Sequence, residues 1–319
     1  MLTRRDWLKI TAGAGAALTL DPRILAGLQM QEITKAIPST GEQIPVIGLG
    51  GRWISTRSSP EELADHRAVL HALANNAPPS GRMFDSAAGY GGGASEELAG
   101  QWAEEDGIQD GIFWATKVNV ASRGGGGADP AEVRAQIDRS FERLRVDVID
   151  LDQVHNMGDP PTQLGILQEY KDQGRIRYIG ITTTSGEQYP ALATVMREYP
   201  IDFIGIDYAI DNRLAETEIL PLAAAEGIAV MVYLPFGRRR LWERIGDRPI
   251  PEWAAEFDAH AWSQFMLKFV VAHPAVTVAA PGTGNPEHMI ENLGAGTGRL
   301  PTEEHRRRMI ELIEGLPQA

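Results

Sequence analysis

Short apolar runs alternate with longer amphipathic segments along most of the chain, and this alternation restricts the possible folds more than any other feature. Eight runs rich in Val, Ile and Leu are candidate strands, at residues 46–50, 83–87, 112–118, 148–155, 178–182, 203–208, 228–234 and 276–281. Helix-like segments lie between them, among them residues 60–75, 129–144, 161–173, 220–226 and 261–272. Eight strands separated by helices predict an α/β fold, a closed parallel (β/α)8 barrel of the TIM type.

An open, doubly wound sheet is the competing arrangement of alternating strands and helices. That fold places a glycine-rich turn directly after its first strand, with a helix following at once. Residues 48–53, with the sequence GLGGRW, lack the third glycine at the required spacing, and no helix pattern begins there. We therefore expect a barrel over residues 33–319, with an N-terminal β-hairpin at residues 33–46 and an extra C-terminal helix.

The longest interval between predicted elements runs from residue 234 to residue 261. It contains three consecutive arginines, Arg238 to Arg240, and two prolines, Pro249 and Pro251. Loops that follow barrel strands lie at the face where barrel enzymes have their active sites. We expect this interval to be a long loop that shapes the pocket.

Composition excludes several classes of protein. The chain has 319 residues and no cysteine, which excludes disulfides, thiolate catalysis and cysteine-ligated zinc or iron–sulfur sites. Its net charge of −13 argues against nucleic acid as a partner, because phosphate binding needs a basic face. No stretch approaches the roughly 20 consecutive apolar residues of a membrane-spanning helix, so we expect no stable membrane span.

Residues 1–32 resemble an export signal. Arg4 and Arg5 are followed by Trp7 and then by a mildly apolar run rich in Ala, Gly, Leu and Thr at residues 10–20. Paired arginines before such a run are typical of the twin-arginine route. We expect the twin-arginine translocation machinery to carry the chain to the periplasm. No clear cleavage site follows, and a helical extension of a cytoplasmic protein is the alternative.

Ionisable side chains stand at the ends of three consecutive predicted strands. Asp85 ends the second strand, Lys117 the third and His155 the fourth, while Tyr90 follows Asp85 on the adjoining loop. The carboxyl ends of barrel strands meet around one mouth, and catalytic residues of barrel enzymes are found there. We expect these four side chains to share one pocket.

This constellation resembles the catalytic tetrad of the aldo-keto reductases, whose Asp, Tyr, Lys and His fall in order on Asp85, Tyr90, Lys117 and His155. The resemblance runs from about residue 33 to the C-terminus, and within the family the chain is similar to bacterial members with a twin-arginine leader. Further stretches that resemble family signatures are residues 175–180, 207–213, 281–282 and 291–295. The resemblance implies an oxidoreductase that reduces a small aldehyde or ketone with NADPH, or alternatively NADH.

The chemistry of carbonyl reduction explains these four residue types independently of the resemblance. The carbonyl carbon receives a hydride and the carbonyl oxygen receives a proton, which a tyrosine such as Tyr90 can donate as a general acid. An ammonium group near a phenol favours the phenolate and so makes the proton easier to give up. Asp85 would hold Lys117 charged and oriented, and His155 would polarise and position the carbonyl.

The residues that the resemblance assigns to the cofactor depart from the family's pattern. Where the family often has Ser-Asn after the fifth strand and Gln in the sixth, this chain has Thr182-Thr183 and Gly205. The other expected cofactor contacts are Pro281, Gly282, Thr283, His288, Glu291 and Asn292, and Trp53 is a candidate wall of the substrate pocket. These positions offer no Lys or Arg for the 2′-phosphate, which leaves the choice between NADP and NAD open.

Other interpretations of the same residues stay open. Asp85 and Lys117 could be a structural ion pair, and His155 a hydrogen-bonded core residue. A metal site is not expected, because Asp150 and Asp152 share one strand face while His155 points to the other. An exported barrel could instead bind a nicotinamide or a sugar-like ligand as a sensory or binding subunit. A lyase or isomerase would use Tyr90 or His155 for proton transfer without net hydride exchange.

Overall fold

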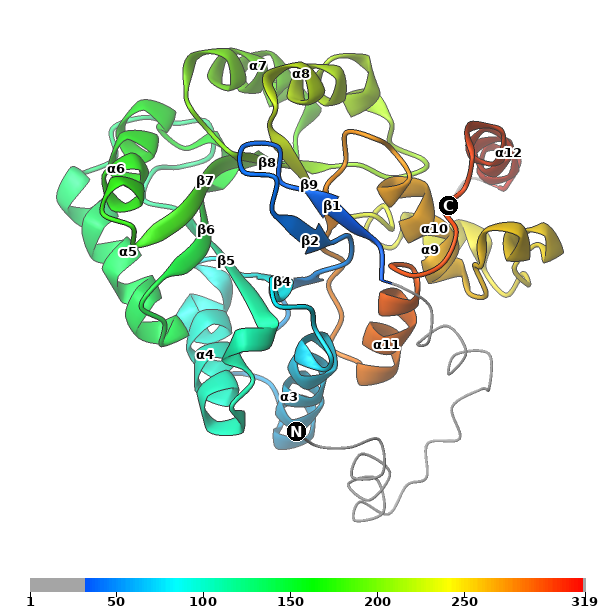
Figure 1. Ribbon diagram of the computed structural model, residues 1–319, viewed down its shortest axis with the longest axis horizontal. Helices are drawn as coiled ribbons and strands as arrows, with labels where there is room; N and C mark the ends of the chain where they lie inside the picture. Colours follow the sequence, from blue (N-terminus) through cyan, green and yellow to red (C-terminus); the bar gives the residue numbers. More distant parts are fainter. Residues whose placement is uncertain (1–31, 318–319) are drawn as a thin grey trace.

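The computed structural model describes residues 32–317 and shows the predicted barrel (Figure 1). Its eight parallel strands follow one another in chain order around the sheet. They are β3 (Leu49–Gly50), β4 (Arg82–Asp85), β5 (Ile112–Val118), β6 (Ile149–Val154), β7 (Ile176–Thr183), β8 (Phe203–Asp207), β9 (Ala229–Tyr233) and β10 (Val278–Ala279). Parallel bridges from Ile47 to Ala279 and from Gly50 to Gly282 join the two edges of the sheet. The predicted fold class is confirmed.

Helices surround the barrel, as the ribbon in Figure 1 shows. They are α3 (Pro60–Ala74), α4 (Ala94–Asp106), α5 (Pro130–Leu144), α6 (Pro160–Asp172), α7 (Tyr189–Glu198), α8 (Ile219–Glu226), α9 (Arg240–Ile245), α10 (Trp262–Val271), α11 (Pro286–Gly294) and α12 (Glu303–Glu314). Local sequence fixes several of their starts. Ser59 and Glu62 form a capping box at α3, and Asp129 caps α5 ahead of Pro130. The final helix, α12, is the expected C-terminal addition.

Alternate side chains of each strand point into the barrel, and their character changes along its axis. Large apolar residues fill the part nearest the strand starts, where Met83, Phe113, Leu151 and Phe203 form one buried cluster. Further along the same inward faces the residues are polar: Asp85 stands two positions after Met83 in β4, and Lys117 four positions after Phe113 in β5. The barrel therefore has an apolar floor beneath a polar mouth.

A hairpin closes the end of the barrel where the strands begin. Its strands are β1 (Thr34–Ala36) and β2 (Gln43–Pro45), and Ile37 and Ile44 belong to the same interior cluster as the barrel floor. Figure 1 shows the hairpin lying across the centre of the barrel. The phenol of Tyr178 in β7 donates a hydrogen bond of 2.6 Å to the Glu42 carboxylate on the hairpin.

The interval between residues 234 and 261 is not the loop that the sequence predicted. It contains the helix α9 and a short 3₁₀ helix at Glu252–Phe257. Leu241 and Ile245 bury one side of α9, and Phe257 is fully buried against Phe265 of α10. Each of these elements is so short that only two apolar residues anchor it to the core. Two positions are too few to show a helical period in the sequence.

The expected export signal lies almost wholly outside the described residues, which begin at Glu32. Within residues 32–317, no helix is both long enough and apolar enough to cross a membrane.

Candidate active site

Asp85 and Lys117 form a buried ion pair at the polar mouth of the barrel. The Lys117 ammonium lies 2.6 Å from Asp85 Oδ2 and also donates to the Ser86 carbonyl at 2.5 Å. Both side chains are almost completely shielded from solvent. Burial alone lowers the pKa of Lys117, but the Asp85 charge and the neighbouring Tyr90 outweigh it and hold that pKa above its ordinary value. Lys117 is therefore a permanent cation at neutral pH.

Tyr90 lies over this pair because the chain turns sharply after β4. Tyr90 begins a short 3₁₀ turn of sequence YGGG in which Gly91 has a φ of 60°. A Cβ at Gly91 would lie 2.6 Å from the Ile54 carbonyl oxygen, so the turn requires glycine there. The Lys117 Nζ is 5.1 Å from the centroid of the Tyr90 ring. The turn thus places a half-buried phenol beside a buried ammonium.

His155 also reaches the mouth, directly after β6 and one strand beyond Lys117. Its ring packs edge-to-face against Tyr90, with 5.7 Å between the ring centroids. The next residues, Asn156 and Met157, both have left-handed backbone conformations, a form of local strain that is common at functional sites. Burial, and after it the positive charges of Lys117 and two arginines, lowers the pKa of His155 to about 3. The imidazole is therefore neutral across the physiological range.

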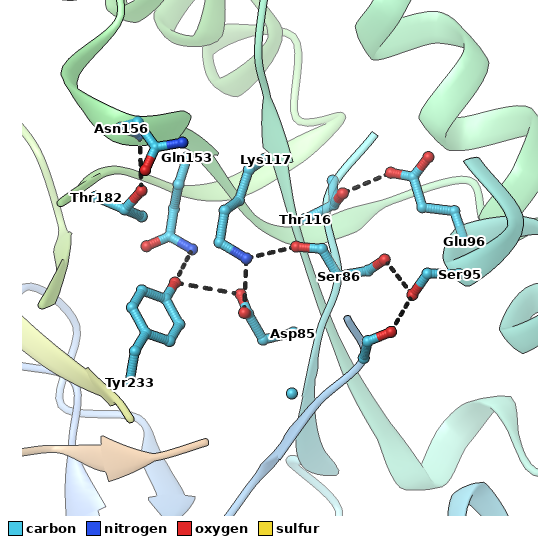
Figure 2. Close-up of polar contacts among 12 residues, drawn as sticks. Asp85, Ser86, Ser95, Glu96, Thr116, Lys117, Gln153, Asn156, Thr182 and Tyr233 are labelled. Carbon is cyan, nitrogen blue, oxygen red and sulfur yellow. Dashed lines mark hydrogen bonds and ion pairs between the residues drawn. The ribbon is translucent and has the colours of Figure 1, made fainter. Parts of the chain in front are cut away.

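Tyr233 and Gln153 complete the polar mouth, and neither was among the sequence candidates. Figure 2 shows the Tyr233 hydroxyl between the Gln153 amide, at 3.3 Å, and Asp85 Oδ1, at 3.4 Å. Burial raises the pKa of Tyr233 well above its usual value, so this phenol stays protonated and donates to Asp85. Tyr233 ends β9 as Asp85 ends β4, so the same strand-end rule could have found it.

Gly205 makes room for the Tyr233 ring. A Cβ at Gly205 would lie 2.5 Å from Tyr233 Cε2 and 2.9 Å from the methyl carbon of Thr182. The space that a side chain at position 205 of β8 would occupy is therefore filled by the Tyr233 ring from the neighbouring strand β9. Any larger residue at position 205 has to displace that ring.

The structure brings only some of the expected cofactor residues to the mouth. Thr182 and Gly282 line the cavity, and the Thr182 hydroxyl accepts a hydrogen bond from the Asn156 backbone at 3.1 Å (Figure 2). Thr183 is fully buried instead, and its hydroxyl donates to Gln188 at 2.6 Å. Strand alternation separates the two threonines, because adjacent residues face opposite sides of the sheet.

The remaining expected residues lie around the edge of the site or behind it. Trp53 donates from its indole to the Gly50 carbonyl at 2.5 Å and packs against His66, so it stands behind the cavity lining. The others are on or before α11: Pro281 is buried, Thr283 bonds to Asn285, His288 is exposed, Glu291 accepts a hydrogen bond from Ser263, and Asn292 is buried.

The polar mouth of the barrel opens into a cavity of about 620 Å³. It is lined by Asp85, Tyr90, Lys117, His155 and Tyr233, together with three arginines, Arg52, Arg123 and Arg238. The residues described in the structure include no cluster of three or more His, Asp or Glu side chains arranged to hold a metal. The cavity can position a small polar molecule against a phenol, an ammonium and a neutral imidazole.

The model of the aldo/keto reductase family matches residues 46–310 of the chain. The chain belongs to this family. An aldo-keto reductase of Strobilurus tenacellus, str7, is 30% identical over 256 residues, which are 70% of this chain and 74% of the relative. The NADH-specific methylglyoxal reductase of Escherichia coli is 29% identical over 210 residues, 59% of this chain and 62% of the relative.

Solved structures of aldo-keto reductases share the fold of this one. A Klebsiella pneumoniae enzyme in complex with NADPH superposes with a TM-score of 0.72 at 22% identity, covering 91% of this chain and 98% of the other. The glycerol dehydrogenase of Gluconobacter oxydans gives a TM-score of 0.71 at 23% identity, covering 89% and 95%. These structural similarities show the barrel fold. The assignment of site residues in this aldo-keto reductase depends on the geometry of its own cavity.

Proposed function

We propose that this aldo-keto reductase reduces an aldehyde or ketone to an alcohol with NADPH, with Tyr90 as the general acid. The observation that supports this most strongly is the convergence of Tyr90, Lys117 and His155 on one cavity. The phenol ring lies 5.1 Å from the ammonium and 5.7 Å from the imidazole. Two relatives are named for the cofactors they use, NADP⁺ in Schizosaccharomyces pombe and NADH in Escherichia coli.

The residues around the mouth fit a nicotinamide ring. Directly beneath the cavity lining, the fully buried Gln153 amide oxygen has no hydrogen-bond partner among the described residues. Thr182 offers a hydroxyl on the same side, and Tyr233 offers a flat aromatic wall. When bound, the reduced nicotinamide supplies the hydride that the carbonyl carbon accepts.

The protein's own groups deliver the proton and hold the carbonyl. Tyr90 transfers its phenolic proton to the carbonyl oxygen and recovers a proton from solvent after the alcohol leaves. Lys117 stabilises the phenolate that forms, and Asp85 keeps the ammonium in place. Because His155 is neutral, it orients the carbonyl oxygen through a hydrogen bond and does not compete with Tyr90 as a charged acid.

Replacing Tyr90 with Phe tests this assignment. The ring still packs while the proton donor is lost, so turnover of a panel of aldehydes should fall roughly 10²-fold or more. NADPH consumption and alcohol formation are measured together, and cofactor binding is followed by nicotinamide fluorescence. Tyr199→Phe, which removes a phenol beyond the cavity lining, is the matched control and should keep full activity.

Three outcomes would contradict the proposal. Undiminished turnover in Tyr90→Phe would show that another group donates the proton. Product formed without consumption of NADPH would favour a lyase or isomerase. Binding of NADPH with no turnover of any carbonyl in the panel would favour a binding or sensory subunit.

We also propose that the chain is a bacterial protein exported to the periplasm by the twin-arginine route. The support is the sequence of residues 3–9, with Arg4 and Arg5 ahead of a mildly apolar run. That route carries folded proteins, so the enzyme could leave the cytoplasm with its cofactor bound. Changing Arg4 and Arg5 together to Lys should retain the protein in the cytoplasm, measured by cell fractionation. Export of the variant at the parental level would reject the proposal.

A further inference from the structure

Three arginines line the catalytic cavity of a strongly acidic protein. The chain as a whole carries a net charge of −13. At the cavity the sign reverses, because the one carboxylate in its lining, Asp85, is already paired with Lys117. Arg52, Arg123 and Arg238 thus add positive charge around the opening that no other carboxylate of the cavity lining offsets.

These guanidinium groups have no partner among the residues that the structure describes. Arg52 and Arg123 are exposed side chains, and neither forms a hydrogen bond or ion pair within residues 32–317. Elsewhere on the surface, arginines such as Arg134 and Arg177 pair with carboxylates. A guanidinium fork is suited to a carboxylate or a phosphate, which it binds through two parallel hydrogen bonds.

Arg52 and Arg123 act on the catalytic side of the cavity. After burial and Lys117, it is the charges of these two arginines that lower the pKa of His155. They come from different loops, Arg52 after β3 and Arg123 after β5, and both reach the cavity that holds His155. Arg238 interacts with Asp207 instead: burial raises the pKa of Asp207, and the Arg238 charge works against that rise.

We propose that Arg52 and Arg123 bind an anionic group on the substrate, so that the enzyme prefers carbonyl compounds that carry a carboxylate or phosphate. This inference rests on the proposed carbonyl reduction. Tyr90 and His155 hold the carbonyl oxygen, and the two arginines hold the anionic end of the same molecule at the opening. An acidic surface around a positively charged pocket also concentrates attraction for anions at the pocket itself.

Matched pairs of substrates test the preference directly. The aldehyde acid 4-oxobutanoate is compared with its methyl ester, and glyceraldehyde 3-phosphate with glyceraldehyde, each with NADPH. We expect kcat/KM to favour the charged member of at least one pair by about tenfold, the effect of a charge-assisted hydrogen bond. The two pairs distinguish a carboxylate from a phosphate. The preference should shrink as salt is added, because the arginines are exposed to solvent.

Variants assign the preference to particular residues. Arg52→Gln and Arg123→Gln should each reduce the charged-to-neutral ratio of kcat/KM several-fold, and Arg52→Lys should retain part of it. Arg139→Gln, which removes an exposed arginine of α5 outside the cavity lining, is the control and should leave the ratio unchanged.

Each other outcome has a definite meaning. Equal reduction of charged and neutral substrates would overturn the inference while leaving the proposed function intact. An unchanged ratio in both Gln variants, with a raised KM for NADPH, would assign the arginines to the cofactor and also overturn it. Failure to reduce any of the four compounds, or any aldehyde of the panel, would reject the proposed function itself.

Discussion

Replacing Lys117 with Met removes the charge of a buried ion pair while keeping much of the side-chain volume. In the variant, Asp85 stays in a site where it is 2% exposed, and its nearest donor is the Tyr233 hydroxyl at 3.4 Å. Stranding one member of a buried pair costs about 3–5 kcal/mol. For a domain of this size, each kcal/mol lowers the melting temperature by roughly 2 °C, so we expect a loss of about 6–10 °C.

The loss should depend on pH, and its sign can be worked out. Burial raises the pKa of Asp85, and the Lys117 charge opposes that rise in the parent. Without Lys117, the folded variant holds a proton on Asp85 that the unfolded chain has released. Its stability therefore falls as pH rises, and the gap to the parent should be smaller at about pH 5 than at about pH 7.

Calorimetry or urea unfolding of the parent and three variants checks this. Asp85→Asn combined with Lys117→Met should recover much of the stability, because no charge remains stranded. Lys268→Met is the matched control: Lys268 is also fully buried, but its ammonium bonds to the carbonyl oxygens of Thr297 and Arg299. Its loss should be the same at the two pH values. A Lys117→Met variant as stable as the parent at both would refute the reasoning.

Two further predictions concern buried positions near the mouth. Gly205→Ala places a methyl group 2.5 Å from the Tyr233 ring and should cost about 1–3 kcal/mol of unfolding free energy. Adding Tyr233→Leu should relieve that cost, and additive losses in the double variant would contradict the packing argument. Burial, and then the Glu96 charge, raises the pKa of Asp152 to about 7, so Asp152 destabilises the fold increasingly as pH rises from about 4 to 7. At about pH 8, Asp152→Asn should therefore be more stable than the parent by up to about 4 kcal/mol of unfolding free energy, measured by urea unfolding. If the parent's stability does not fall between about pH 4 and pH 7, the argument is wrong.

The sequence predicted the parts of the site that obey a local rule. Asp85 and Lys117 could be found because each is an ionisable residue at the end of an otherwise apolar strand, and the structure pairs them at 2.6 Å. Thr183, which the resemblance also assigns to the cofactor, is fully buried with its hydroxyl on Gln188, because adjacent residues of β7 face opposite sides of the sheet.

Features that depend on two distant segments were beyond reach of the sequence. The contact of Gly205 with Tyr233 joins adjacent strands, and neither residue alone reveals it. The helix α9 is too short to show a period, and the pairing of most arginines with carboxylates is decided by tertiary packing. Only the finished structure shows that Arg52 and Arg123 are without such partners among residues 32–317.

The hairpin that closes the floor of the barrel also decides how the enzyme can be held. Because β1 lies beneath the strand starts, the chain leading into Thr34 joins the molecule at the end opposite the cavity. A tether, tag or solid support attached ahead of the hairpin leaves the mouth facing outward.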